Sequence, residues 1–259
     1  MKRVVKIGGR AQSSPDLVSR IAEAWKAAPK SFCVVHGGGD DISAMQRRVG
    51  SEPSFVDGRR ITTREDIEIV RMVLSGLVNK RLVSRLVAAG VPAVGISGED
   101  AGTIAATPID ADGLGRAGKP VSVKPDLIQM LLDAGYLPVI SPLAGEDGGL
   151  PGEALNVNGD DAAAAIAIAI GGAELLLVAD VAGVLDGSGV PIVSLDPTEA
   201  SGLIHSGVIN RGMRAKLEAG FVALAGGVGR VRISALNGLN DPAGGTQLAL
   251  AQSHITCPL

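Results

Sequence analysis

Short apolar runs alternate with amphipathic stretches along most of the chain, and these two patterns predict alternating strands and helices. The apolar runs that we expect to form strands are residues 4–7, 32–35, 93–96, 137–140, 174–178 and 230–235. The stretches with helical spacing are residues 14–28, 40–49, 63–77, 79–89, 125–134, 197–207 and 211–226. Such an alternation predicts an α/β fold, a three-layer αβα sandwich with helices on both faces of a mostly parallel central sheet.

Three segments break this pattern or leave it ambiguous. Residues 107–123 are polar and rich in glycine, which predicts a β-hairpin or an excursion over the site. Residues 144–151 are expected to form a loop. The alternating run 162–170 is compatible with a strand, but its alanines and the preceding Asp160 and Asp161, which we expect to cap it, favour a buried helix.

Glycine and proline residues around positions 152–155 mark the plainest boundary in the chain. We predict an N-terminal lobe, residues 1–155, and a C-terminal lobe, residues 156–259, that share one continuous sheet. Near the end of the chain, Gly244 and Gly245 predict a turn before a final short strand.

Composition narrows the classes of function. Hydrophobic residues make up 46% of the 259 residues and aromatic residues only 2%, so the core is expected to be aliphatic. The formal net charge of -3 provides no basic field for nucleic acid or for an anionic membrane. The longest apolar run is too short to cross a bilayer, and the two cysteines, Cys33 and Cys257, indicate no disulfide framework. With a strand expected at the start of the chain, these features predict a cytoplasmic protein without a signal peptide.

Two of the expected strands end in glycine-rich turns that suit anion binding. The first strand carries Lys6 and leads into Gly8 and Gly9, and the second leads into three glycines that begin at Gly37. A cation at the carboxyl end of a strand, followed by exposed backbone N–H groups, can hold phosphate oxygens. In a parallel sheet both turns lie at one edge, which is where open α/β sheets bind ligands.

Two familiar signatures of phosphoryl-transfer proteins are absent. The chain has no G-x-x-x-x-G-K-[ST] sequence and no H-R-D catalytic loop, which excludes a P-loop enzyme and a protein kinase. One G-x-G-x-x-G sequence occurs at residues 113–118, but no apolar strand precedes it and no helix is expected directly after it. We therefore interpret that match as part of a loop rather than as a dinucleotide site.

Six motifs, in order along the chain, resemble those of the amino acid kinase family. They are KIGG at 6–9, VHGGG at 35–39, FVDGRRIT at 55–62, LVNK at 77–80, NVNGD at 156–160 and GMRAK at 212–216. The resemblance extends from Lys2 to about Thr246, and within the family the chain is similar to enzymes that phosphorylate N-acetyl-L-glutamate. Arg59 stands where the family has leucine, and the region after Ile233 is short and atypical.

The resemblance implies a carbamate kinase-like fold and an ATP-dependent phosphotransferase of arginine biosynthesis. Its substrates would be ATP and N-acetyl-L-glutamate, and its products ADP and N-acetyl-L-glutamyl 5-phosphate, with Mg²⁺ bridging the phosphates and no protein carboxylate as a metal ligand. The N-terminal lobe would bind the acyl-amino acid and form a homodimer, and the C-terminal lobe would bind ATP. Arginine-inhibited relatives carry an extra N-terminal helix, so the early first strand predicts an arginine-insensitive dimer.

The resemblance assigns catalytic roles to three charged residues. Lys6 would lie between the β- and γ-phosphates, although a lysine at the mouth of a strand is also compatible with a simple edge position. Lys216 would hold the phosphates from its helix, where a lone lysine is more often a solvated surface residue. Asp160 would position both lysines, and it is also a candidate for the cap of its helix.

Four residues are implied for the acyl-amino acid. Gly37 and Gly38 would donate N–H hydrogen bonds to its carboxylate and to the reacting group, the alternative being a tight turn with no ligand. Arg60 would clamp a carboxylate bidentately, the alternative being a solvated pair with Arg59. Asn156 would bond the α-carboxylate and the amide, although asparagine is also common in loops.

The nucleotide-binding residues implied by the resemblance are Gly8, Gly9, Asp180, Gly183, Val184 and Leu185. The first two belong to the first glycine turn, the third ends a strand, and the last three resemble the adenine-side loop. We expect His36 to be a structural residue beside the second glycine turn.

Two other functions remain open. A kinase for a related acylated acid, such as N-acetylaminoadipate or carrier-linked aminoadipate, would share these motifs, although residues 55–58 favour the glutamate derivative. A non-catalytic module of the same fold that senses an amino acid or a nucleotide is the second alternative. The presence of Lys6, Asp160 and Lys216 argues against it, because binding alone does not require all three.

Overall fold

A sheet of eight strands forms the centre of the computed structural model, which describes residues 2–209 and 211–250; Cys257 lies outside the described residues. The strands are β1 Arg3–Ile7, β2 Phe32–His36, β5 Ala93–Ser97, β8 Leu137–Ser141, β11 Glu174–Val178, β12 Ser194–Leu195, β13 Val231–Ser234 and β14 Thr246–Leu248. Their order is β12-β14-β13-β11-β1-β2-β8-β5. Among the described residues, neighbours in this sheet run parallel except β13 and β14. The predicted α/β fold with a mostly parallel sheet is confirmed.

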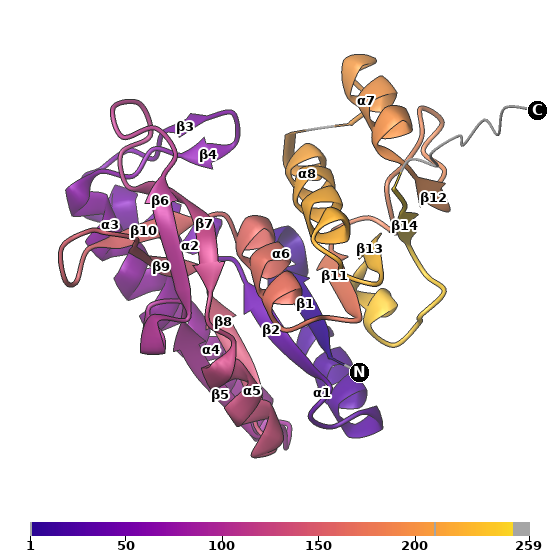
Figure 1. Ribbon diagram of the computed structural model, residues 1–259, viewed down its shortest axis with the longest axis horizontal. Coiled ribbons are helices and arrows are strands. Elements are labelled where there is room, and N and C mark those ends of the chain that lie inside the picture. Colours follow the sequence, from indigo (N-terminus) through magenta and orange to yellow (C-terminus); the bar gives the residue numbers. More distant parts are fainter. Residues whose placement is uncertain (1, 210, 251–259) are drawn as a thin grey trace, which may run out of the picture.

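Helices cover both faces of this sheet (Figure 1). On one face α1 (Leu17–Ala27) packs beside α4 (Asn79–Ala88), and on the other α6 (Gly159–Ala169) packs beside α8 (Arg211–Ala225). α6 lies against β1, β2 and β11, α8 lies against β11, β13 and β14, and α5 (Asp126–Asp133) packs against β8 and β2. No described helix is both long enough and apolar enough to cross a bilayer.

The central strand β1 explains why the two glycine turns meet. Val4, Val5 and Ile7 are fully buried, as expected for a parallel strand whose two faces are both covered by helices. Ile7 is in register with His36 of β2 and with Val178 of β11. The segments that follow these three strands therefore start side by side at the carboxyl edge of the sheet, where α/β sheets place their ligands.

Four further strands close into a small ring beside the central sheet, in the order β10-β7-β6-β9. They are β6 Ile104–Pro108, β7 Ala117–Val123, β9 Leu143–Glu146 and β10 Ala154–Val157. β6 and β7 are antiparallel, which confirms the predicted hairpin. The prediction of a loop over 144–151 is wrong in its first part, because β9 pairs with both β10 and β6. The predicted lobe boundary falls inside β10, and the division into two lobes stays a prediction.

A two-stranded hairpin, β3 (Phe55–Val56) and β4 (Arg59–Arg60), projects from the left part of the molecule toward α8 (Figure 1). Its turn consists of Asp57 and Gly58, which both have positive φ angles, 49° and 79°. Two successive residues with positive φ make the tight hairpin turn that Asp-Gly favours. No strands were predicted for residues 55–60, so this hairpin is seen only in the structure.

The predicted helices over 63–77 and 79–89 form one uninterrupted helical segment. It consists of α3 (Arg64–Arg71), a π-helical stretch η2 (Met72–Val78) and α4. Thr63 caps α3 through the expected capping box, in which its side chain accepts from the N–H of Asp66. The π-helical stretch was not foreseen, and it matters because its Leu74 reaches the site described below.

The cap of α6 differs from the prediction. Asn158 is the N-cap, and its Oδ1 accepts the backbone N–H of Asp160 at 2.8 Å. Asp160 and Asp161 therefore lie within the first turn of the helix, and their carboxylates are available for other partners. The prediction that residues 162–170 form a buried helix rather than a strand is confirmed.

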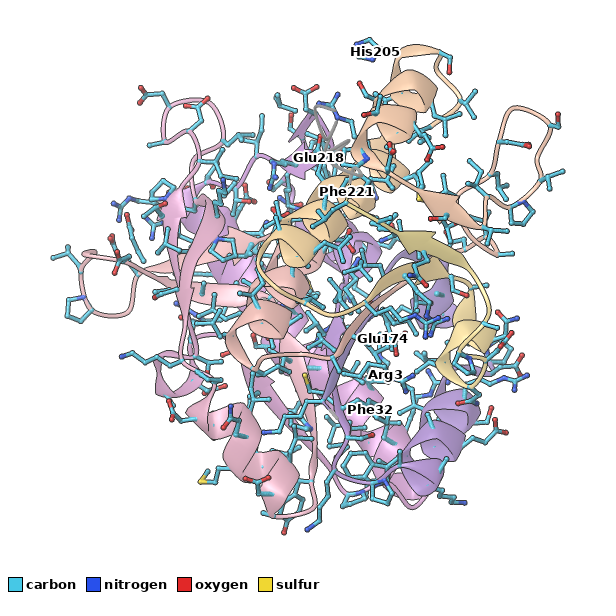
Figure 2. The ribbon with its side chains drawn as sticks, turned by 45° about the vertical axis from the view of Figure 1, so that its right-hand side comes forward. Arg3, Phe32, Glu174, His205, Glu218 and Phe221 are labelled. Carbon is cyan, nitrogen blue, oxygen red and sulfur yellow. The ribbon has the colours of Figure 1, made fainter. Side chains whose placement is uncertain are left out.

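A cation–π contact and an ion pair lie at the amino end of the sheet. Arg3 lies over the ring of Phe32, with 5.1 Å between its Cζ atom and the ring centroid, and Glu174 bonds the buried Arg232 at 2.6 Å (Figure 2).

The remaining helices are α2 (Gly39–Arg48), α7 (Pro197–His205), and the short 3₁₀ segments η1 (Gly9–Ser13), η3 (Asp100–Gly102) and η4 (Leu236–Leu239). The final short strand predicted after Gly245 is confirmed as β14.

Candidate active site

Two cavities open at the carboxyl edge of the central sheet. The larger has a volume of about 600 Å³ and lies between the β3–β4 turn, the segment after β11 and the first turns of α8. The smaller has a volume of about 240 Å³ and lies between the second glycine turn, α2, η2 and β10. The residues that line both cavities are Gly8, Gly58, Arg59, Asn158 and Asp160. The cavities therefore meet, and two molecules bound in them would come into contact at Asp160.

Asp160 holds two lysines at this junction. Its Oδ1 lies 3.0 Å from Nζ of Lys6, and Nζ of Lys216 donates to Oδ1 at 3.1 Å and to Oδ2 at 3.2 Å. Lys6 comes from the carboxyl end of β1, Asp160 from the first turn of α6 and Lys216 from α8. The side chains of Lys6 and Asp160 are only 8% and 6% exposed, so the cluster is largely shielded from water. The structure brings the three predicted catalytic residues together.

The charges of this cluster depend on one another. Burial alone would raise the pKa of the Asp160 carboxyl, but the charges of Lys6 and Lys216 and their hydrogen bonds hold that pKa below its usual value. Burial, and then the charge of Lys6, lowers the pKa of Lys216 to about 8, while the charge of Asp160 opposes the shift. The junction thus carries a net positive charge at neutral pH, which suits a phosphate group.

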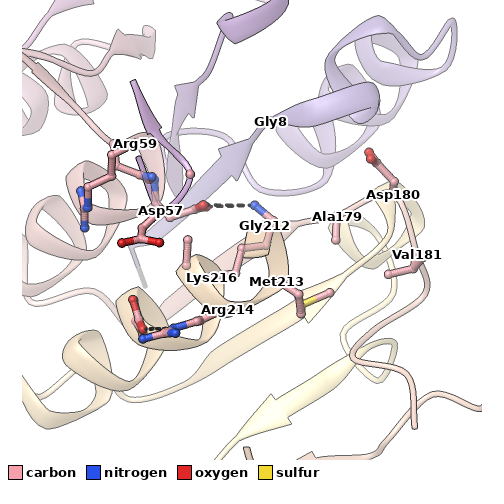
Figure 3. Close-up of a pocket in the computed structure, with 15 residues that line it drawn as sticks. Gly8, Asp57, Arg59, Ala179, Asp180, Val181, Gly212, Met213, Arg214 and Lys216 are labelled. Carbon is pink, nitrogen blue, oxygen red and sulfur yellow. Dashed lines mark hydrogen bonds and ion pairs between the residues drawn. The ribbon is translucent and has the colours of Figure 1, made fainter. Parts of the chain in front are cut away.

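The large cavity has polar walls from three parts of the chain (Figure 3). Asp57 and Arg59 of the hairpin face Lys216 and Arg214 of α8, while Asp180 and Val181 lie at the other end. Asp180 Oδ1 accepts the backbone N–H of Ala11 at 3.0 Å, which fixes η1 against this wall. Asp180 therefore lies where the sequence placed it, on the wall of the expected nucleotide pocket.

Of the other predicted nucleotide-binding residues, some line the large cavity and some do not. Gly8 lines both cavities, and a Cβ atom there would overlap Nζ of Lys6. Gly9 is the first residue of η1. Gly183, Val184 and Leu185 are not among the residues that line the large cavity. Val184 is buried, and its N–H donates to Thr246 Oγ1 at 2.8 Å.

The second glycine turn forms one wall of the small cavity, but Gly37 does not act as the sequence suggested. Its N–H already donates to the Ile7 carbonyl at 3.0 Å, so it is not available to a ligand. Gly38, which precedes α2, and Gly39, its first residue, also line the cavity. The first N–H groups of a helix have no partner within the helix, so this turn still presents donors.

Arg60 is held in the small cavity by a buried network. Its Nη2 donates to the Gly39 carbonyl at 2.9 Å and to Ser43 Oγ at 2.8 Å, and its Nη1 donates to Gln46 Oε1. Gln46 in turn donates from Nε2 to Asp66 Oδ1 at 2.7 Å. The alternative of a solvated pair with Arg59 does not hold, since Arg60 is 7% exposed and anchored. Three of its five N–H groups are engaged, and Arg60 lines the small cavity, where its contact with a carboxylate stays a prediction.

Asn156 and Arg59 complete the small cavity. Asn156 Nδ2 donates to Thr62 Oγ1 at 3.1 Å, which fixes the amide at the cavity wall. Arg59 bonds Asp161 at 3.0 Å and lines both cavities, although no role was predicted for it. Gln46 was also missed. The only signal for Arg59 was its departure from the family pattern, and nothing in the sequence pointed to Gln46.

The residues present offer no built metal cage. Among the described residues there is no group of three or more His, Cys, Asp or Glu side chains that could hold an ion. The carboxylate at the junction, Asp160, is already bonded to two ammonium groups. A divalent cation that enters with a bound phosphate fits this arrangement, since Mg²⁺ is usually held by phosphates, water and few protein groups.

Comparison with known proteins decides the family. The model of the amino acid kinase family matches residues 1–234. The chain belongs to this family. The resemblance inferred from the six motifs is confirmed, whereas the roles assigned to Lys6, Asp160 and Lys216 stay predictions.

Relatives and solved structures agree with this assignment. Acetylglutamate kinase of Chloroflexus aurantiacus is 41% identical over 247 residues, which cover 94% of this chain and 95% of that protein. Acetylglutamate kinase of Paracoccus denitrificans is 43% identical over 233 residues, 89% of this chain and 76% of that protein. The structure of smu.665 from Streptococcus mutans has a TM-score of 0.82 at 29% identity, covering 95% of this chain and 98% of that one.

The fold of a more distant enzyme is also similar. Carbamate kinase from Giardia lamblia bound to AMP-PNP has a TM-score of 0.71 at 16% identity, and the match covers 96% of this chain and 98% of that one. At this identity the likeness concerns the fold alone. The predicted carbamate kinase-like fold is confirmed.

Proposed function

We propose that this protein is an ATP-dependent kinase that phosphorylates the side-chain carboxylate of N-acetyl-L-glutamate, the acetylglutamate kinase step of arginine biosynthesis. The observation that carries the proposal is the junction of the two cavities at Lys6, Asp160 and Lys216. The choice of acceptor is supported by relatives named acetylglutamate kinase, which are 40–43% identical over about nine-tenths of the chain.

The two substrates would enter from opposite sides of the junction. ATP would occupy the large cavity, with its phosphates directed toward Lys216 and the first glycine turn. The acyl-amino acid would occupy the small cavity, with a carboxylate near Arg60 and Asn156. Its reacting carboxylate would then face the terminal phosphoryl group across Asp160, which satisfies the alignment that phosphoryl transfer requires.

The chemical step needs no proton transfer. The acceptor carboxylate is ionised at neutral pH. One of its oxygens forms the new bond to the γ-phosphorus while the bond to the bridging oxygen breaks, and ADP leaves with that electron pair. Lys6 and Lys216 neutralise the charge that spreads over the transferring group, and Asp160 keeps the two ammonium groups in place.

Mg²⁺ in this proposal accompanies ATP. When bound, it supplies positive charge to the phosphate oxygens. Because Asp160 is occupied by two lysines, we assign the protein no dedicated metal cage, and the ion would be held by phosphate and water.

A turnover assay tests the proposal. Purified protein is given MgATP and N-acetyl-L-glutamate, and the acyl phosphate is trapped as a hydroxamate while ADP release is followed separately. We expect ADP and hydroxamate in equal amounts from the wild type, and both to form far more slowly with Lys6→Met. Absence of hydroxamate with the wild type would overturn the proposed function.

The same assay separates the two alternatives. A larger kcat/KM for N-acetyl-L-aminoadipate than for N-acetyl-L-glutamate would favour a kinase of the related acid. Tight ATP binding by calorimetry, without turnover on either acid, would favour a sensing module. Neither alternative is favoured by the named relatives, which are acetylglutamate kinases.

We also propose a cytoplasmic homodimer, as the resemblance implies. The surface of the long helical segment supports self-association, because Met72, Leu77 and Val87 are 62%, 44% and 54% exposed. Exposed apolar side chains that gather on one element can mark an interface. Light scattering at micromolar concentration should give twice the mass of one 26.1 kDa chain, and a monomer would contradict the dimer.

A further inference from the structure

Two side chains without a role in the proposed reaction converge on one carbonyl oxygen in the second glycine turn. Nε2 of Gln12 donates to the Gly37 carbonyl at 3.1 Å, and Nδ1 of His36 lies 2.7 Å from the same oxygen. The N–H of Gly37 is bonded to the Ile7 carbonyl at 3.0 Å. The peptide groups on both sides of Gly37 are therefore fixed.

The fixed carbonyl determines the direction of the next N–H group. In a planar trans peptide the carbonyl of one residue and the N–H of the following residue point in opposite directions. The N–H of Gly38 consequently points away from Gln12 and His36. Gly38 lines the small cavity, together with Lys6 and Asp160 of the junction. Holding the Gly37 carbonyl is thus a way to aim the Gly38 N–H.

His36 is suited to hold this carbonyl permanently. It is fully buried, and its Nε2 lies 3.0 Å from Nδ2 of Asn79. A carbonyl oxygen can only accept and an amide nitrogen can only donate, so the hydrogen is on Nδ1 and the lone pair on Nε2. Burial lowers the pKa of His36 to about 4, so the ring stays neutral and keeps this tautomer at neutral pH.

Gln12 is held from the opposite side. It belongs to η1, and its neighbour Ala11 donates its N–H to Asp180 Oδ1 on the wall of the large cavity. η1 therefore connects the wall of the large cavity to the Gly37 carbonyl beside the small one. A short 3₁₀ segment anchored at one end presents the side chain of Gln12 in a defined place.

We propose that Gln12 and His36 are positioning residues that aim the Gly38 N–H at the phosphoryl group during its transfer. The inference rests on the proposed phosphoryl transfer at the junction of the cavities. A backbone N–H directed at developing negative charge stabilises the transition state, and it does so best when it needs no reorganisation. Gln12 and His36 act through Gly38 and need not touch either substrate.

Substitutions of Gln12 give the sharpest test, because Gln12 is only partly buried. Gln12→Met keeps the length and removes the donor, and Gln12→Glu replaces the donor by a charge that repels the carbonyl. We expect kcat to fall about fivefold to thirtyfold, with both KM values within about twofold of wild type, because the lost interaction belongs to the transition state. Ser19→Ala, which removes a hydrogen bond from the nearby α1, is the control and should leave kcat unchanged.

Variants of His36 extend the test. His36→Asn keeps a donor near the Nδ1 position and should retain more of the wild-type kcat than His36→Leu, provided that circular dichroism shows both to be folded. If His36→Leu does not fold, the Gln12 variants and the ¹⁵N shifts of the wild-type imidazole decide the question. Those shifts should show a protonated Nδ1 and an unprotonated Nε2, and the reverse tautomer would overturn the inference.

The outcomes separate this inference from the proposed function. Turnover of N-acetyl-L-glutamate by the wild type decides the proposed function. With turnover present, an unchanged kcat in both Gln12 variants, or a change confined to KM, would overturn the positioning role. If the wild type shows no turnover, the ratio of its binding affinities for AMP-PNP and ADP is measured in place of kcat. Gln12→Met should weaken AMP-PNP binding more than ADP binding, and equal effects on both would overturn the inference.

Discussion

The two cavities differ in how firmly their walls are fixed. In the small cavity, polar side chains are tied to buried neighbours, as Arg60 is to Gln46 and Asn156 is to Thr62. In the large cavity, the wall formed by α8 carries Arg214, which is 59% exposed and bonds Glu218 of its own helix, itself 54% exposed. An exposed pair of this kind contributes little to rigidity.

This difference indicates where each kind of selectivity lies. The small cavity is preorganised before any ligand binds, so it can discriminate between acceptors by shape and by the placement of donors. The large cavity offers backbone groups and cations that any nucleoside triphosphate would meet. Substitutions in the two walls should therefore change different kinetic constants, and substitutions at the junction should change kcat.

The largest effect is expected at the junction. Lys6→Met should lower kcat by about 100-fold or more, because a cation at developing charge is worth several kcal/mol in a shielded site. Lys216→Met should lower kcat more than about tenfold for the same reason. Lys30→Met, which loses an exposed lysine bonded to the Asp133 carbonyl, is the matched control. Steady-state kinetics test both junction variants, and thermal melting checks that they are folded. A near-normal kcat in Lys6→Met or Lys216→Met would exclude the substituted lysine from the mechanism.

Neighbouring glycines provide the next test of the rigid wall. A Cβ atom at Gly38 would lie 2.6 Å from Cδ2 of Leu74 and 3.3 Å from Cγ2 of Val78, whereas one at Gly37 would have no neighbour closer than 3.7 Å. Gly38→Ala should lower kcat/KM for the acyl-amino acid about tenfold or more, since overpacking shifts the turn. Gly37→Ala should stay within about threefold of wild type. Equal losses in the two variants would show that space is not what limits this turn.

The central sheet of this fold could be predicted from the sequence, whereas only the hairpin of β6 and β7 could be predicted in the small ring of strands. A central parallel strand such as β1 is a continuous apolar run because helices cover both its faces, and the glycine turn after it is visible as a motif. β9 and β10 are four residues each and show no alternation, since they lie in a ring whose pairing depends on distant segments. Their strand state depends on tertiary pairing, which local pattern does not reveal.

The candidate site divides in the same way. Lys6, Asp160 and Lys216 could be proposed because each belongs to a motif that resembles one of the amino acid kinase family. Gln46 and Gln12 could not be found, because a glutamine gains meaning only from the partner that the fold brings to it. The engaged N–H of Gly37 is a similar case, since its acceptor, Ile7, lies on another strand.

A moderate effect is expected when the support of Arg60 is removed. Gln46→Leu deletes the bond to Arg60 Nη1 and leaves Asp66 without its donor at 2.7 Å. The guanidinium should become less well placed, so KM for the acyl-amino acid should rise about tenfold while KM for ATP changes little. Arg60→Lys should behave similarly, because lysine keeps the charge and loses the fork. A rise in KM for ATP instead would show that Arg60 does not serve the acyl-amino acid.

The smallest expected effect is a pH dependence of kcat/KM for ATP, which arises from Lys216 in the large cavity. Burial, and then the charge of Lys6, lowers the pKa of Lys216 to about 8, against the opposing charge of Asp160. In the free enzyme kcat/KM for ATP should therefore fall as pH rises through this value, to about half of its maximum at pH 8. Bound phosphate favours the ammonium, so the corresponding fall in kcat should lie at higher pH. Lys216→Arg should abolish the fall near pH 8, because a guanidinium keeps its proton there.

Unfolding cannot explain such a loss if Lys216 is its origin. The folded-state pKa lies below the unfolded value, so the unfolded chain binds more protons between about pH 8 and pH 10.5. The free energy of unfolding contributed by this group therefore increases with pH over that range, while kcat/KM for ATP decreases. Parallel urea titrations and kinetics from pH 7 to pH 9.5 would reveal the opposite slopes. A fall in both quantities that persists in Lys216→Arg would place the titrating group elsewhere in the protein.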